Sequence, residues 1–167
     1  MAIEKELDIT SRDSYILITG SAYDDTIANS GAGVTIIGGK GDGVITNTGT
    51  KVTISGGAGN DRIYNYASSV VTLQGGAGND TLWGGTGKDT FIYASGDGKD
   101  VISGFGSNDL LKITGTFSAS YNSSANSIAF KVGKASNAIT LKDFGSTTTF
   151  HVNSTTYQLS GGKLTQK

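Results

Sequence analysis

A glycine-rich nonapeptide that returns in phase along the chain is the feature that most restricts the fold. Four segments align without gaps and begin 18, 18 and 19 residues apart: GSAYDDTI (20–27), GGKGDGVI (38–45), GGAGNDRI (56–63) and GGAGNDTL (75–82). A half-step copy, GGTGKDTF, occupies 84–91, and two looser copies follow at 95–102 and 104–111. The unit is therefore a nonapeptide, and two units make one coil of about 18 residues.

Short alternating runs fill the other half of each early coil. They read apolar-polar-apolar, the pattern of a strand with one buried face, and they lie at 16–18, 34–36, 52–54 and 71–73. Asparagines recur at the same phase, where a stacked amide ladder could form: Asn29, Asn47 and Asn65. Two strands and two turns per coil predict a flattened solenoid of parallel stacked strands, whose coils bury their apolar faces only by stacking.

The repeat fades after about residue 110. Alternating segments at 127–132, 138–143 and 149–152 are separated by Gly, Ser and Asn turns and read as strands of another arrangement. A solenoid needs a cover on its last coil. We therefore expect an all-β chain in which residues 1–115 form a parallel β-roll, with two strands per coil, and residues 116–167 form an antiparallel β cap.

Composition excludes several classes of protein. The chain has no cysteine, which excludes disulfides, zinc-thiolate sites and thiol catalysis and leaves a metal as the obvious staple. Its formal net charge of -1 predicts no attraction to nucleic acid or anionic membrane. No apolar run approaches the roughly 18 residues of a membrane span. The N-terminus lacks the apolar region of a cleavable signal peptide, so none is expected.

The turn sequence GGxGxD points to calcium. Successive carbonyls of an extended backbone point to opposite sides, and glycines at positions 1, 2 and 4 allow the turn to bend tightly. Position 6 supplies a carboxylate, and position 5 is an Asn or Asp in several copies. When two such turns stack, about six oxygens line the gap between them, which is the ligand type and number that calcium takes.

Turns one coil apart should lie on the same edge of the roll. One edge then carries the turns that begin at 20, 38, 56, 75 and 95, and the other carries those at 84 and 104, so that up to about five calcium ions fit between them. The gap between the turns at 56 and 75 ranks first because both read GGAGND, whereas Gly43 leaves its turn without a carboxylate at position 6. The candidate metal ligands are Asp24, Asp25, Asp42, Gly56, Gly57, Ala58, Gly59, Asn60, Asp61, Gly75, Gly76, Ala77, Gly78, Asn79, Asp80, Gly84, Gly85, Gly87, Asp89, Asp100, Asn108 and Asp109.

These motifs resemble a known family. The nonapeptides at 56–64, 75–83 and 84–92 match the pattern GGxGxDxUx of repeats-in-toxin (RTX) proteins. Residues 100–113 resemble the stretch that closes such repeats in secreted bacterial proteases, lipases and alginate epimerases. The resemblance implies calcium ligands at turn positions 1 to 6, upstream domains of a larger parent protein, and export to the extracellular medium. It also implies that a C-terminal address, within the cap, is read by a type I secretion channel.

Three functions compete at this point. The first, which we expect, is a monomeric calcium-binding module that folds only when calcium fills its turns and supports secretion of a larger protein. The second is an enzyme, but His151 is the only histidine and no serine or cysteine motif accompanies it, so we expect no catalysis. The alternative is a binding surface on the roll, for ice at Thr35, Thr53 and Thr72 or for a glycan at Tyr64, Tyr66 and Trp83.

Overall fold

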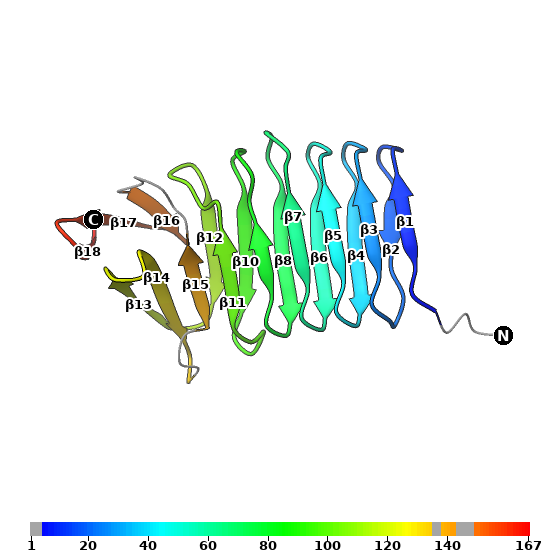
Figure 1. Ribbon diagram of the computed structural model, residues 1–167. Helices are drawn as coiled ribbons and strands as arrows, with labels where there is room; N and C mark the ends of the chain where they lie inside the picture. Colours follow the sequence, from blue (N-terminus) through cyan, green and yellow to red (C-terminus); the bar gives the residue numbers. More distant parts are fainter. Residues whose placement is uncertain (1–4, 135–137, 143–148) are drawn as a thin grey trace.

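Two parallel sheets wound from one chain face each other in a solenoid of about six coils, and the residues that the structure describes form no helix. The computed structural model describes residues 5–134, 138–142 and 149–167. Residues 1–4 of the expected roll and Asp143 of the expected strand 138–143 lie outside this range. Figure 1 shows the coils stacked side by side, with the C-terminal strands closing one end.

Each coil gives one strand to each sheet. Sheet A contains, in stacking order, β1 (Asp8–Ser11), β3 (Thr26–Asn29), β5 (Val44–Asn47), β7 (Arg62–Asn65), β9 (Thr81–Trp83) and β11 (Asp100–Ser103). Sheet B contains β2 (Leu17–Thr19), β4 (Thr35–Lys40), β6 (Thr53–Ala58), β8 (Thr72–Ala77), β10 (Thr90–Ala94) and β12 (Leu110–Thr114). The predicted parallel roll with two strands per coil is therefore confirmed.

The turns form two edges, which lie at the bottom and the top of Figure 1. The first edge leads from sheet B to sheet A and carries the turns 20–25, 38–43, 56–61, 75–80 and 95–100. The second edge leads back to sheet B and carries 12–16, 30–34, 48–52, 66–71, 84–89 and 104–109. This is the division of the repeated turns that their spacing predicts.

The core is a set of stacked aliphatic and aromatic ladders. The apolar residue two places after position 6 points inward from sheet A, as do the alternating residues of sheet B, and all are at most 5% exposed: Ile18, Ile27, Ile36, Ile45, Ile54, Ile63, Leu73, Leu82, Phe91, Ile102 and Leu111. Each lies beside its counterpart one coil away in the strand register. One coil alone would expose these side chains, so stacking stabilises the fold.

Unequal coil lengths are absorbed at the edges, and the strands stay in register. Thr53 pairs with Thr72, 19 residues later, and the additional residue lies in the second-edge turn 66–71. Thr81 pairs with Val101, 20 residues later, and the additional residues lie at the first-edge turn around Gly96, where an added Cβ would have no atom within 4 Å.

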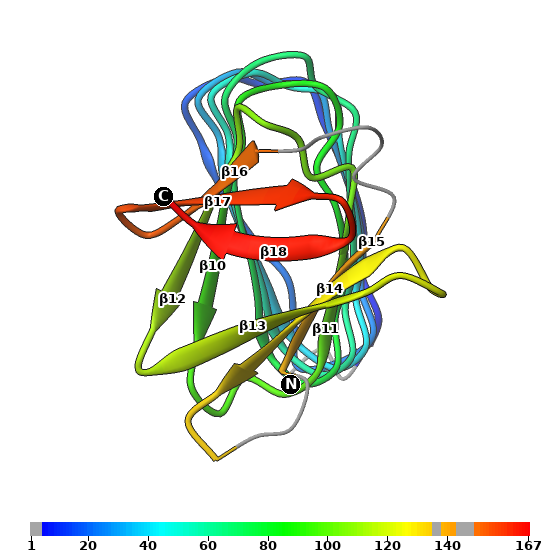
Figure 2. The same cartoon turned by 90° about the vertical axis from the view of Figure 1, so that its left-hand side faces the viewer.

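The C-terminal strands complete both sheets and then cross the end of the roll. They are β13 (Phe117–Asn122), β14 (Ser127–Val132), β15 (Ile139–Lys142), β16 (Thr149–Val152), β17 (Thr155–Ser160) and β18 (Lys163–Gln166). Antiparallel pairing joins β13–β14–β15 and β16–β17–β18, and Figure 2 shows these hairpins lying across the opening. Two pairings were not expected: β15 is parallel to β11, and β16 is parallel to β12.

Aromatic packing joins this end to the last coils. The Phe105 ring lies 5.6 Å from that of Phe91 and 6.3 Å from that of Phe150, which stacks on Tyr157 at 5.4 Å. Phe105 occupies position 2 of the turn 104–109, where the repeat favours glycine, and it is buried in the core. The opposite end of both sheets consists of β1 and β2.

Candidate metal-binding turns

Backbone carbonyls of the first-edge turns alternate in direction. At position 2, the Ser21 carbonyl points toward the following coil, where it accepts the Lys40 N–H at 3.0 Å. At position 3, the Ala77 carbonyl points back and accepts the Gly59 N–H at 2.8 Å. Neighbouring turns therefore present carbonyl oxygens to each other, as an extended turn backbone predicts.

Glycine lets these turns stack at backbone contact. Gly57, at position 2, has φ 116°, a conformation that other residues rarely adopt. A Cβ added there would collide with the Gly39 carbonyl oxygen of the preceding turn. Glycine is therefore needed at this position for two reasons: it adopts the positive φ, and it leaves room for the carbonyl of the preceding turn.

Carboxylates at position 6 form a buried row along the first edge, and each reaches one coil back. The Oδ1 of Asp61 accepts the Gly43 N–H at 2.8 Å, that of Asp80 accepts the Asp61 N–H at 2.8 Å, and that of Asp100 accepts the Asp80 N–H at 3.1 Å. Asp25 does the same for Leu7 at 2.7 Å and also accepts from the Ser21 hydroxyl at 2.8 Å. A carboxylate that makes this bond with one oxygen still has a second oxygen for another partner.

That second oxygen is without a partner in the two best-matched turns. Among the buried side chains of the described residues, only Asp61 Oδ2 and Asp80 Oδ2 lack a hydrogen bond. Asp61 Oδ2 shares a small cradle with the next turn, because a Cβ added at Gly56 would lie 2.6 Å from the Gly75 carbonyl oxygen and still closer to Asp61 Oδ2. An unpartnered carboxylate oxygen beside a carbonyl oxygen fits a hard cation.

Burial raises the pKa of these carboxyl groups. It raises the pKa of Asp80 to about 6 and that of Asp100 to about 7; the Asp61 carboxylate adds to the shift of Asp80, the Asp80 carboxylate adds to that of Asp100, and Asp97 adds to both. The pKa of Asp61 is raised for the same reason, with a smaller contribution from Asp42. A row of charges that are buried without a counter-ion is costly, and a bound cation would remove that cost.

The donor set favours calcium over transition metals. Across the part of the chain that the structure describes, no three His, Cys, Asp or Glu side chains converge on one point. A metal between these turns would therefore take mainly backbone carbonyls and one or two carboxylates, which are calcium ligands.

Position 5 forms a second row that the sequence analysis did not foresee. Its side-chain oxygens accept the N–H of the next position 5: Asp24 from Asp42 at 2.7 Å, Asp42 from Asn60 at 2.6 Å, Asn60 from Asn79 at 2.9 Å, and Asn79 from Lys99 at 3.0 Å. Each of these side chains thus has one backbone partner, and their role as metal ligands stays a prediction. The recurrence of Asn and Asp was the available signal.

The second edge buries asparagine amides in the early coils and carboxylates in the last two turns. The expected amide ladder is confirmed in the first coils, with Asn29 Nδ2 donating to Asn47 Oδ1 at 2.8 Å and Asn47 Nδ2 donating to Asn65 Oδ1 at 2.9 Å. Buried carboxylates begin only at Asp89, whose N–H donates to Asp109 Oδ1 at 2.7 Å.

The candidate ligands of the second edge lie together in its last two turns. Gly84, Gly85 and Gly87 lie with Asp89 in one turn, and Asn108 is exposed beside Asp109 in the next. Burial raises the pKa of Asp89 to about 7 and raises that of Asp109. Both oxygens of Asp109 are bonded, because Oδ2 accepts the Gly106 N–H at 2.7 Å. The Oδ2 of Asp89, which corresponds to that of Asp61, accepts only from Asn65 Nδ2, at 3.5 Å.

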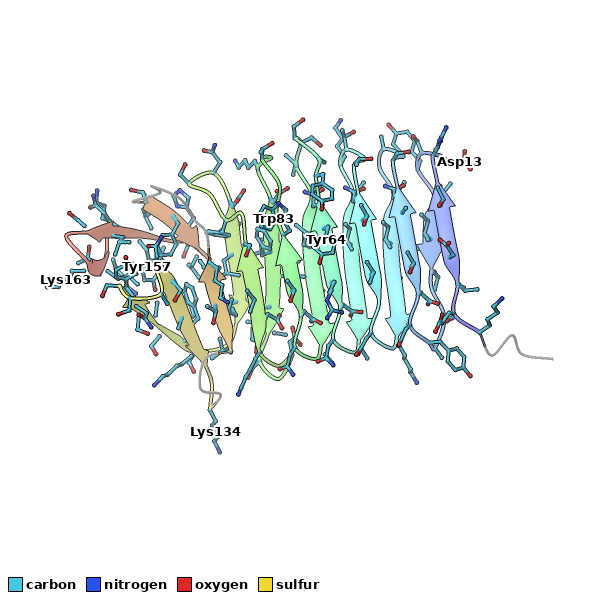
Figure 3. The ribbon with its side chains drawn as sticks, viewed as in Figure 1. Asp13, Tyr64, Trp83, Lys134, Tyr157 and Lys163 are labelled. Atoms are coloured by element: carbon cyan, nitrogen blue, oxygen red, sulfur yellow. The ribbon has the colours of Figure 1, made fainter. Side chains whose placement is uncertain are left out.

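The outer faces carry the residues of the alternative binding surfaces. Thr35, Thr53 and Thr72 align in one row of sheet B, with Thr90 as a fourth member. Tyr64 and Trp83 are neighbours on sheet A, as Figure 3 shows, and Tyr66 stacks on Tyr64 at 6.4 Å. His151 lies on an exposed face, 3.3 Å from the Thr156 hydroxyl. Among the described residues, the buried polar atoms that lack a hydrogen bond are in the turns and not on these outer faces.

Comparison with known proteins concerns the same turns. The family model of the RTX calcium-binding nonapeptide repeat matches four copies, at residues 52–66, 72–98 and 92–112. No curated protein matches the chain. No helix among the described segments is long and apolar enough to cross a membrane.

Proposed function

Because residues 52–112 of this chain are repeats of the RTX calcium-binding family, which imply calcium binding, we propose that the chain is a calcium-dependent folding module. The observation that carries the proposal is the pair of buried, unpartnered oxygens, Asp61 Oδ2 and Asp80 Oδ2. Calcium would neutralise these carboxylates and hold neighbouring turns together.

The gap between the turns 56–61 and 75–80 is the strongest site. It combines the Asp61 carboxylate with the Gly75 carbonyl, and Asp80 follows in the second turn. The gap between 38–43 and 56–61 is weaker because Gly43 supplies no carboxylate. Asp25 accepts hydrogen bonds from the Leu7 N–H and from Ser21. These bonds already stabilise its carboxylate, so we expect weaker calcium binding in the first gap.

The module serves the folding and secretion of a larger protein and has no catalytic activity of its own. Calcium is scarce inside cells and abundant outside, so that binding would favour the folded roll after export. Type I secretion, an extracellular location and a parent protein with upstream domains follow from the family resemblance. The buried carboxylates support this proposal because their repulsion disfavours the roll where calcium is scarce.

Calcium titration tests the proposal directly. Far-UV circular dichroism and isothermal titration calorimetry on the full chain, in metal-depleted buffer, should show a gain of β-signal and saturable heat with CaCl₂. MgCl₂ at the same concentration should give little of either. The double change Asp61→Asn and Asp80→Asn should weaken calcium binding, with Asp42→Asn as the exposed control. An unchanged titration of the double variant, or full β-signal and full thermal stability without calcium, would contradict the proposal.

A further inference from the structure

The two edges of the roll satisfy their buried polar atoms in opposite ways. Asn47 is 0% exposed, and its amide makes four hydrogen bonds. Its Oδ1 accepts from Asn29 Nδ2 at 2.8 Å and from the Gly49 N–H at 3.1 Å. Its Nδ2 donates to Asn65 Oδ1 at 2.9 Å and to the Gly49 carbonyl at 2.9 Å. Every donor and acceptor of this side chain is therefore used.

The asparagines form a neutral row, which we term the amide rail: Asn29, Asn47 and Asn65. Asn29 bonds in the same way to both the N–H and the carbonyl of Gly31, whereas Asn65 accepts the Ala67 N–H alone. The equivalents of position 6 at this edge are valines, all buried: Val34, Val52 and Val71. This part of the second edge thus contains no buried carboxylate, whereas the first edge buries four: Asp25, Asp61, Asp80 and Asp100.

The amide rail ends where the carboxylates begin. Asn65 Nδ2 donates to the Gly84 carbonyl at 2.9 Å and to Asp89 Oδ2 at 3.5 Å. The Asp89 Oδ1 then accepts the Val71 N–H at 3.0 Å, in the way that Asp80 serves Asp61 on the first edge. The change from a self-satisfied edge to a charged edge therefore occurs at one residue, Asp89.

We infer that the amide rail is a calcium-independent seam, which keeps the segments beside it, residues 26–36, 44–54 and 62–73, ordered when calcium is removed. The seam needs no counter-ion, because a buried amide whose hydrogen bonds are all made carries little desolvation cost. Removal of calcium then opens the first edge along the whole roll, but it opens the second edge only from Asp89 onward. The inference deepens the proposed function and rests on it for the calcium dependence of the other turns.

Hydrogen exchange of the intact chain, followed by mass spectrometry with calcium and in metal-depleted buffer, tests the inference. Exchange in residues 84–113 should become at least about tenfold faster without calcium, and exchange in residues 44–54 and 62–73 less than about threefold faster. A tenfold calcium response in 84–113 with an equal response in 44–54 and 62–73 would overturn the seam and leave calcium binding intact. No response anywhere would overturn the proposed function instead.

The isosteric change Asn47→Asp breaks the rail with little change of shape. At neutral pH its carboxylate would face the Gly49 carbonyl and Asn65 Oδ1, both of them acceptors, without a donor to offer. In metal-depleted buffer, exchange in 44–54 should be at least about tenfold faster than in the wild type. Ile45→Val is the matched control, since it removes one methylene from the same strand and leaves the rail intact, and it should act equally with and without calcium.

If Asn47→Asp increases exchange in metal-depleted buffer no more than Ile45→Val does, the inference is overturned. If Asn47→Asp prevents folding even with calcium, the wild-type exchange pattern alone decides, because it compares the two edges without any substitution.

Discussion

Asp80 holds the backbone of Asp61 from one coil away: its Oδ1 accepts the Asp61 N–H at 2.8 Å, while its Oδ2 is buried without a partner. One carboxylate thus does two things. It joins consecutive coils through one oxygen and leaves the other for a ligand. The same relationship, repeated between Asp61 and Gly43, makes the stacking of the first edge inseparable from its buried charge.

The first prediction separates these two roles. Asp80→Asn keeps an oxygen for the Asp61 N–H but removes the charge, so calcium affinity should fall at least tenfold, about 1.4 kcal/mol. Asp42→Asn should have a smaller effect, because Asp42 is exposed and its oxygen already accepts the Asn60 N–H. Calorimetric titration of both variants measures the difference. A larger loss in Asp42→Asn would reverse the ranking of the gaps.

A second prediction concerns pH. Burial raises the pKa of Asp80 to about 6 and those of Asp89 and Asp100 to about 7, against about 3.9 in an unfolded chain. The folded state therefore binds more protons, and the calcium-free roll should lose stability as the pH rises from about 4 to about 7.

Thermal unfolding in metal-depleted buffer at pH 4.5 and pH 7.5 measures this effect, with a higher Tm at the lower pH. Saturating calcium should oppose the trend, since protons and calcium compete for the same oxygens. A calcium-free Tm that is higher at pH 7.5 would show that the carboxyl groups are not buried as described.

A third prediction compares two glycines with similar backbone and different surroundings. Gly57 and Gly96 have φ 116° and 105°, so alanine at either site is strained by about 1–2 kcal/mol. An added Cβ at Gly57 collides with the Gly39 carbonyl, whereas one at Gly96 meets nothing within 4 Å. The free energy of unfolding of Gly57→Ala should therefore be lower than that of Gly96→Ala by about 1–3 kcal/mol, the typical cost of overpacking. Urea unfolding with calcium present tests this, and equal losses would mean that the turns can separate freely.

A fourth prediction concerns the closed end. Phe150 is 1% exposed and packs between Phe105 and Tyr157, so Phe150→Ala should cost about 3–5 kcal/mol of unfolding free energy. Tyr66→Ala is the aromatic control, because Tyr66 is 59% exposed, and it should cost under about 1 kcal/mol. Similar losses in the two variants would argue that the C-terminal strands do not support the roll.

The sequence alone predicted the features that repeat. Coil length, strand positions, the division of turns between edges and the row of Asn29, Asn47 and Asn65 follow from periodicity, because equivalent residues stack on one another. The C-terminal pairings did not follow, since alternation shows that 149–152 is a strand but not that β16 lies parallel to β12. The burial of Phe105 did not follow either, because a core aromatic stands there at a turn position where the repeat has glycine.

The buried carboxylates of the turns were predictable from the sequence, but their hydrogen bonds were not. That Asp61 and Asp80 each keep a free oxygen, while Asp25 and Asp109 do not, depends on the backbone N–H groups of Ser21 and Gly106, which bond the Oδ2 atoms of Asp25 and Asp109. The direction of a backbone N–H depends on the local conformation of each turn, so a consensus motif cannot report it.

The uneven coil lengths have a consequence for engineering. The additional residue of the turn 66–71 leaves Thr53 aligned with Thr72, and the additional residues near Gly96 leave Thr81 aligned with Val101. Strand register is thus insulated from length changes at these two places. A foreign peptide grafted there would be displayed at the rim of the roll, while the stacked ladders behind it keep their order.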